Sequence, residues 1–289
     1  MRAALAALAC LLMVLLATTY EGDSPELRAG IMEVVDAIEI APDTIATTAA
    51  GRPELRGDVL KEYESMASRM RFVAHGVGLS IGSYDRWNVE YLGLLDQLMK
   101  RVELDWHSEH LACTTVDGEN LGTMLAMPRT RESLDLLCER VDRIQTRYRK
   151  EFLLEHVIRL LPEPEAEFSD AGFLNELVRR SGCGLIIDAY NLECDRFNYG
   201  FDVQGFLNEL NLDAVREIHV AGGTTQAGFQ LDIHSRVTAD STLELARAIL
   251  TSTSNVRMLT YEFLREAIPS LGVDAIIAEL KRIRGALLS

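Results

Sequence analysis

The chain alternates eight times between a short apolar run and a longer amphipathic segment, and this alternation limits the folds open to it. The apolar runs, bounded by turn residues, are at 11–19, 36–42, 71–76, 103–110, 151–158, 182–190, 216–222 and 256–263. The amphipathic segments, which have helical spacing, are at 24–35, 57–70, 88–102, 130–148, 170–182, 203–211, 240–250 and 273–288. Continuous apolar strands separated by helices are typical of parallel sheets covered on both faces. Eight such units predict an α/β fold, a (β/α)8 TIM barrel.

No Pro-rich linker or break in composition divides the 289 residues, so we expect one TIM-barrel domain over residues 1–289. The N-terminus imitates a secretory signal, with a positive residue, an apolar stretch and small residues. Cleavage there would remove the first predicted strand, so we interpret residues 1–10 as a surplus extension. The apolar stretch is also shorter than the roughly 20 residues that a membrane span needs. We therefore expect a cytoplasmic protein without membrane association.

The overall charge narrows the classes of partner. The formal net charge is −15, and no long basic run is present, whereas a nucleic-acid surface needs clustered Lys and Arg. Five cysteines show no C-x-x-C pairing, which fits unpaired thiols in a reducing compartment. We expect no nucleic-acid partner.

Histidines and carboxylates gather at the ends of the predicted strands. All six histidines lie at the end of an apolar run or just after one. The carboxyl ends of barrel strands meet at one rim, where active sites of such barrels lie. On this rim we place His75, His110, Glu155, Asp188, His219 and Glu262, with Asp232 and His234 in the loop after the seventh strand. Imidazole and carboxylate together suit zinc, iron or manganese, and a buried carboxylate needs a cation. The pattern predicts one metal site.

Other polar residues near the rim are harder to assign. Asp232 and His234 lie two residues apart, so in an extended segment they point to the same side with good chelating spacing. Glu155 and His156 are adjacent and should point to opposite sides. The remaining intermediate cases are Glu39, His107 and Asn191.

In this order the motifs resemble the multinuclear non-haem iron-dependent oxidative enzymes (MNIO), to which the methanobactin-synthesis oxidases are similar. The resemblance covers roughly residues 30–265. It rests on HGVGLS at 75–80, SEHL at 108–111, LLE at 153–155, GCGLIID-x-x-N at 182–191, G-F-D at 200–202, EIH-x-AG at 217–222, D-x-H at 232–234, and Glu262. Two positions depart from the family pattern. His156 and Tyr190 stand where the family usually has Asn.

The resemblance implies a TIM barrel that binds two or three iron ions and uses dioxygen to modify a residue, Cys or Asp-like, in a ribosomally made precursor peptide. The implied metal ligands are His75, His110, Glu155, Asp188, Asn191, His219, Asp232, His234 and Glu262. We assign catalytic roles to Asp232, His234 and Glu109, and Glu109 is also a candidate for orienting ligands. A separate partner protein that binds the leader part of the peptide is expected, because a barrel mouth offers little area for specific binding.

A second class of function stays open from the residues alone. His/Asp/Glu rims on the same barrel also serve divalent-metal isomerases and hydrolases that act on small molecules. The spacing of D-x-H and EIH-x-AG favours the oxidase. A degenerate, non-enzymatic barrel that binds peptide is disfavoured by the near-complete set of ligand-type residues. Long loops at 113–129, 161–170 and 191–203 are expected to form a groove over the rim.

Overall fold

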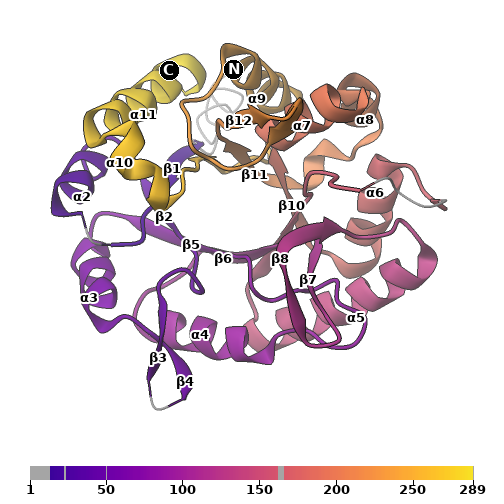
Figure 1. Ribbon diagram of the computed structural model, residues 1–289, viewed down its shortest axis with the longest axis horizontal. Coiled ribbons are helices and arrows are strands. Elements are labelled where there is room, and N and C mark those ends of the chain that lie inside the picture. The colour runs from indigo at the N-terminus through magenta and orange to yellow at the C-terminus, as the bar shows by residue number, and fades with distance from the viewer. Residues whose placement is uncertain (1–13, 23, 50, 162–165, 289) are drawn as a thin grey trace, which may run out of the picture.

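A computed structural model describes residues 14–22, 24–49, 51–161 and 166–288, and eight parallel strands close into a barrel (Figure 1). In their order round the barrel the strands are β1 (Leu15–Thr19), β14 (Met258–Tyr261), β11 (Val215–Val220), β10 (Gly184–Asp188), β9 (Glu151–Glu155), β6 (Trp106–His110), β5 (Arg71–Gly76) and β2 (Ala37–Ile40). Each strand lies within or overlaps one of the eight apolar runs, so the predicted TIM barrel is confirmed. The proposed extension at 1–10 lies outside the described residues.

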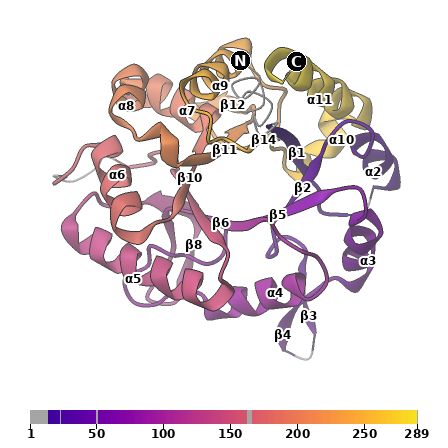
Figure 2. The ribbon, with the colours of Figure 1, turned by 180° about the vertical axis from the view of Figure 1, so that it is seen from behind.

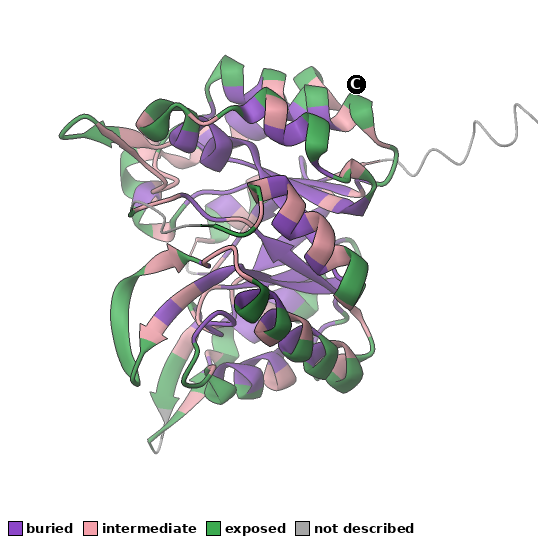
Figure 3. Cartoon of the chain, turned by 90° about the vertical axis from the view of Figure 1, so that its right-hand side faces the viewer, coloured by how far each residue is buried: buried purple, intermediate pink, exposed green. Residues whose placement is uncertain are grey.

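Helices surround the barrel, as the views from both ends show (Figures 1 and 2). They are α2 (Pro25–Ile31), α3 (Gly57–Met66), α4 (Val89–Met99), α5 (Arg131–Tyr148), α6 (Asp170–Ser181), α7 (Ala189–Tyr199), α8 (Val203–Glu209), α9 (Asp240–Ser252), α10 (Ile268–Leu271) and α11 (Val273–Leu287). In α5, Leu134, Leu137 and Val141 recur at helical spacing and are buried. The Thr130 side chain begins this helix by accepting a hydrogen bond from the amide of Ser133. Buried residues line the strands and the inner helix faces (Figure 3).

Three antiparallel hairpins follow the carboxyl ends of barrel strands. They pair β3 (Ala46–Ala49) with β4 (Arg52–Leu55), β7 (Ala112–Val116) with β8 (Glu119–Ala126), and β12 (Thr224–Gln226) with β13 (Phe229–Leu231). The expected loop at 113–129 is therefore largely the β7–β8 hairpin. Of the expected loop at 161–170, residues 162–165 lie outside the described part of the chain.

The expected loop at 191–203 is wrong, because most of it belongs to α7. The Asp188 side chain begins this helix by accepting hydrogen bonds from the amides of Tyr190 and Asn191. All residues from 189 to 195 are buried, including Glu193 and Asp195. A helix that is buried on nearly all sides, with polar residues inside, shows no apolar stripe, so the usual periodic signal is missing.

The half of the barrel interior nearer the amino-terminal ends of the strands, here called the lower half, is apolar. Its buried cluster consists of Ala17, Ala37, Val73, Trp106, Leu153, Ile186 and Met258. Side chains alternate between the two faces of a strand, so the inward-facing positions next in line toward the carboxyl ends are two residues further along. Those positions hold the polar residues described below. In the described parts of the chain, no helix is long and apolar enough to cross a membrane.

Candidate metal centre

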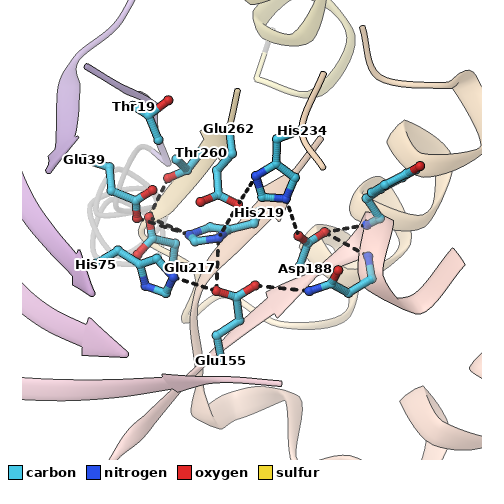
Figure 4. Close-up of polar contacts among 12 residues, drawn as sticks. Thr19, Glu39, His75, Glu155, Asp188, Glu217, His219, His234, Thr260 and Glu262 are labelled. Atoms are coloured by element: carbon cyan, nitrogen blue, oxygen red, sulfur yellow. Dashed lines mark hydrogen bonds and ion pairs between the residues drawn. The ribbon is translucent and has the colours of Figure 1, made fainter. Parts of the chain in front are cut away.

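Side chains from several strands converge near the carboxyl ends of the strands, in the upper half of the barrel (Figure 4). They come from the carboxyl ends of β2, β5, β6, β9, β10, β11 and β14 and from the segment after β13. The residues brought together are Glu39, His75, His110, Glu155, Asp188, Glu217, His219, Asp232, His234 and Glu262. All of these are buried except Asp232 and His234, which are half-buried.

Two histidines are held so that one ring nitrogen faces the cluster. The Ser108 hydroxyl donates to the carbonyl of Ala74 at 3.0 Å, so it accepts the hydrogen of His75 Nδ1, which lies 2.9 Å away. His110 Nδ1 lies 2.9 Å from the Gly76 carbonyl and donates to it. In both rings the Nε2 lone pair is left pointing inward. Backbone and hydroxyl partners of this kind commonly orient metal-binding histidines.

Glu155 meets both of these histidines. Its Oε2 lies 2.9 Å from His75 Nε2 and 3.6 Å from His110 Nε2, and the two ring nitrogens are 3.4 Å apart. Three atoms with lone pairs thus face one point. A buried arrangement of this kind is unfavourable unless a cation, either a proton or a metal ion, lies among the atoms.

His219 bridges two groups of carboxylates. Its Nδ1 lies 3.0 Å from Glu262 Oε2 and 3.5 Å from Glu155 Oε2. Its Nε2 faces the other way and lies 3.3 Å from Glu39 Oε2 and 3.5 Å from Glu217 Oε1. A proton on Nε2, between two carboxylates, leaves the Nδ1 lone pair facing the centre.

Glu217 is itself fixed by neighbours. It accepts hydrogen bonds from the Trp106 indole at 2.9 Å and from the Thr260 hydroxyl at 2.5 Å. In the sequence Glu39 was an intermediate case, and Glu217 was not predicted to belong to the site. A signal was available for Glu217, because it lies two residues before His219 on one strand and therefore faces the same side.

A third group lies at the open end of the cluster. Asp232 Oδ1 lies 2.5 Å from His234 Nε2, and Asp188 Oδ2 lies 3.9 Å from the same nitrogen. The other oxygen of Asp188 is occupied by the α7 amides, so only Oδ2 is free for a ligand. His234 adopts a positive φ of 41°, an uncommon conformation for a residue other than glycine that often marks functional sites.

The pKa values of several groups in the cluster are shifted far from their usual values. Burial raises the pKa of Glu155 well above its usual value, that of Asp188 to about 7 and that of Glu39 to about 8. Burial acts in the opposite direction on His219, but Glu262, Glu39 and Glu155 outweigh it and raise the His219 pKa well above its usual value. Perturbed groups of this kind cluster at functional sites.

Many of the inward-facing atoms are buried and make no hydrogen bond of regular geometry, only the close approaches given above. They are Glu39 Oε1 and Oε2, Glu155 Oε2, Asp188 Oδ2, His219 Nδ1 and Nε2, Asp232 Oδ1 and His234 Nε2. Unsatisfied buried polar atoms are rare in folded proteins and need an explanation. The donor set is mixed imidazole and carboxylate without thiolate, which fits zinc, manganese or iron.

Several overlapping sets of side chains could each hold one metal ion. They are His75, His110 and Glu155; His75, His219 and Glu262; Glu155, Asp188, His219 and Glu262; Asp188, Asp232 and His234; and Glu39, Glu217 and His219. Glu155 and Asp188 each belong to two of these sets, and a carboxylate could be shared by neighbouring ions.

Not every residue singled out in the sequence joins the cluster. Glu109 faces the outer side of β6. There its Oε1 lies 3.7 Å from His107 Nε2, and its carboxylate interacts with the Tyr91 hydroxyl. Adjacent residues on a strand face opposite sides, which separates Glu109 from His110. The structure therefore does not bring Glu109 or His107 to the proposed ligands.

Asn191 and His156 lie at the border of the cluster. Asn191 Nδ2 is 3.4 Å from both Glu155 Oε1 and the His156 carbonyl. The His156 ring lies outside the ligand sets, and burial lowers its pKa to about 4 although the Ile186 carbonyl acts to raise it.

The fold and this cluster define a TIM-barrel protein with a candidate multinuclear metal centre on its carboxyl-terminal rim. Comparison with known families agrees with the motifs. The chain belongs to the family described as RiPP precursor modification enzymes MbnB/TglH/ChrH, which matches residues 27–287. The resemblance found in the motifs is thereby confirmed, and the family is one of enzymes that modify ribosomally made precursor peptides.

Relatives and solved structures extend the comparison. A UPF0276 protein of Caulobacter sp. (strain K31) is 32% identical over 243 residues, covering 83% of this chain and 84% of the relative. A UPF0276 protein of Caulobacter vibrioides is 30% identical over 215 residues, covering 74% of each chain. D-Psicose 3-epimerase from Clostridium cellulolyticum H10 superposes with a TM-score of 0.64 at 11% identity, covering 96% of this chain and 100% of that one. At this identity the superposition shows the shared barrel fold alone.

Proposed function

We propose that this protein uses two or three iron ions and dioxygen to oxidise a residue, Cys or Asp-like, of a ribosomally made precursor peptide. The observation that carries the proposal is the group of buried, unpartnered nitrogen and carboxylate atoms that face one another at the rim. His75, His110, Glu155, Asp188, His219, Asp232, His234 and Glu262 would hold the ions, with Asn191 beside them. When bound, ferrous iron supplies the redox chemistry with dioxygen.

The protein side chains have separate tasks in this proposal. Ser108 and the Gly76 carbonyl orient His75 and His110, and Glu39 with Glu217 holds the proton on His219 Nε2. The apolar layer beneath the cluster keeps water from the lower side. These contacts preorganise the ligands, so that the geometry does not have to form during the reaction.

Asp232 and His234 are the residues to which we assign contact with the substrate. His234 is 15% exposed, more than any other member of the cluster, and lies at the open end. Its Nε2 is 2.5 Å from Asp232 Oδ1, so these two atoms can share either a proton or a metal ion. The position of Glu109 does not support the catalytic role expected for it.

The test begins with metal analysis of protein purified without air. We expect more than one iron atom per chain, and consumption of dioxygen only when ferrous iron and the precursor peptide are both present, with a leader-binding partner protein supplied. Mass spectrometry of the peptide after co-expression should show a modified mass, and Glu262→Gln should abolish the modification. A single tightly held zinc ion, or an unmodified peptide from iron-loaded protein, would contradict the proposal.

A further inference from the structure

A cavity of about 210 Å³ lies beside the metal centre, between the ends of β8 and β9 and the helices α6, α7 and α8. Leu111, His156 and Leu192 line it, and each directly follows a residue of the cluster or its border in the chain. The cavity therefore adjoins the same strand ends as the metal centre.

The walls of the cavity are mainly apolar. Met127, Leu174, Phe201 and Phe206 contribute side chains from four different segments. An apolar cavity of about 150 Å³ is large enough to bind benzene. This cavity is larger, so it can accept an aromatic ring that carries a substituent.

The charged residues of the lining neutralise one another. Asp170 Oδ2 accepts from Arg129 Nη1 at 2.7 Å, and Asp170 also pairs with Arg159. Asp195 Oδ1 accepts from the Arg159 amide at 3.0 Å, and its Oδ2 lies 3.9 Å from Arg159 Nε. Two positive and two negative groups sum to no net charge, so this lining favours an uncharged occupant.

The His156 ring provides polar atoms in the cavity wall that a ligand could use. Both ring nitrogens are buried and make no hydrogen bond of regular geometry, although the Ile186 carbonyl lies near the ring, and the ring centroid lies 6.1 Å from that of Phe206. A buried polar atom without a partner is unfavourable, and a ligand that supplies the partner gains specificity. A hydroxyl group both donates and accepts, so it can pair with either imidazole nitrogen, whichever carries the hydrogen.

We infer that this cavity binds the phenol side chain of a tyrosine in the peptide substrate, with its hydroxyl on His156. This inference rests on the proposed function for the identity of the substrate, and it assigns the cavity a role in choosing the peptide. A tyrosine seated here would anchor the peptide at the rim that carries the metal centre. His156 is then a specificity-determining residue that takes no part in the oxidation.

The test uses the full-length protein treated with a chelator, and the side-chain analogues p-cresol and toluene as probes in isothermal titration calorimetry. Both should bind, and p-cresol should bind about threefold to tenfold more tightly because it makes one additional hydrogen bond. His156→Phe should keep the binding of toluene and remove the preference for p-cresol. Leu174→Trp, which fills the cavity, should abolish the binding of both probes.

The controls separate the cavity from the metal centre. Glu262→Gln should leave both affinities unchanged, and thermal unfolding checks that each variant is folded; if Leu174→Trp does not fold, His156→Phe decides. Equal affinity for the two probes, a preference unaffected by His156→Phe, or p-cresol binding only to iron-loaded protein would overturn the inference. Peptide oxidation is measured separately, so its failure beside a retained preference for p-cresol would refute the proposed function and leave only the preference of the cavity for a phenol.

Discussion

The two halves of the barrel interior are built from the same strands and have opposite chemistry. On β9, Leu153 lies in the apolar lower layer and Glu155, two residues later, lies in the metal centre. On β10 the corresponding pair is Ile186 and Asp188. At the lower end, Arg216 and Arg257 form ion pairs with Glu151, and all three side chains are partly exposed.

The apolar lower half stabilises the fold, whereas the polar upper half destabilises it. Burial of apolar side chains contributes about 25 cal/mol per Å², and the lower layer makes this contribution. The upper half buries carboxylate oxygens that lack a hydrogen-bond donor. Their burial lowers the free energy of unfolding until a cation binds. In TIM barrels the upper rim carries function, while the lower end contributes mainly to stability.

The largest effect should follow from a change in the upper half. Glu155→Gln removes the carboxylate shared by two candidate metal sets, so we expect metal content and peptide modification to fall by about 100-fold or more. Circular dichroism should show an unchanged fold. Metal analysis and mass spectrometry of the peptide measure the outcome, and retained iron with retained activity would show that the centre lies elsewhere.

A substitution at Leu153, two residues before Glu155 on the same strand, should have the opposite effect: it should lower stability and leave iron binding unchanged. Leu153→Ala opens a cavity in the apolar layer and should lower the free energy of unfolding by about 2–5 kcal/mol. Urea unfolding of the metal-free protein measures this loss. Iron per folded chain should be unchanged, and a selective loss of iron would mean that the two halves are not separable.

Removal of the metal tests whether the upper half depends on a cation. At free ferrous iron of about 100 times the Kd of a site, each bound ion should stabilise the folded state by about 2.7 kcal/mol. Thermal unfolding under anaerobic conditions, with and without chelator, measures the difference. The Glu155→Gln variant should respond much less, and an equal response would point to binding outside the centre.

Glu39→Gln tests the residues that orient His219. The amide cannot accept the His219 proton as strongly as the carboxylate does, so iron affinity should weaken by about 10- to 100-fold. The same ions should still bind at higher concentration, which an anaerobic iron titration would show. Complete loss of binding would indicate that Glu39 is itself a metal ligand.

The smallest effect should come from Glu151→Gln, the matched control at the lower end of β9. It weakens partly exposed ion pairs with Arg216 and Arg257, so stability should fall by about 1 kcal/mol or less. Iron content and peptide modification should match the wild type. A large loss of activity here would break the division between the two halves.

Much of the fold and of the site could be predicted from the sequence, and the predictions that were wrong have physical causes. The strand ends at His75, Asp188 and Glu262 were predicted because each follows an apolar run of strand length. The error at α7 arose because that helix is buried on most sides and shows no amphipathic stripe. The hairpin at 46–55 was not anticipated, since short polar strands give a weak periodic signal.

The sequence by itself determined the eight repeating units, and with them the rim on which ligand-type residues meet, because the order of strands and helices sets the closure of such a barrel. It also determined the family, through motifs in a fixed order. Only the tertiary structure decided which side chains meet across the barrel. It brought Glu217 and Glu39 to the same nitrogen of His219, since that meeting depends on the closure of strands that are distant in the chain. The cavity beside His156 likewise exists only where β8, β9, α6, α7 and α8 pack together.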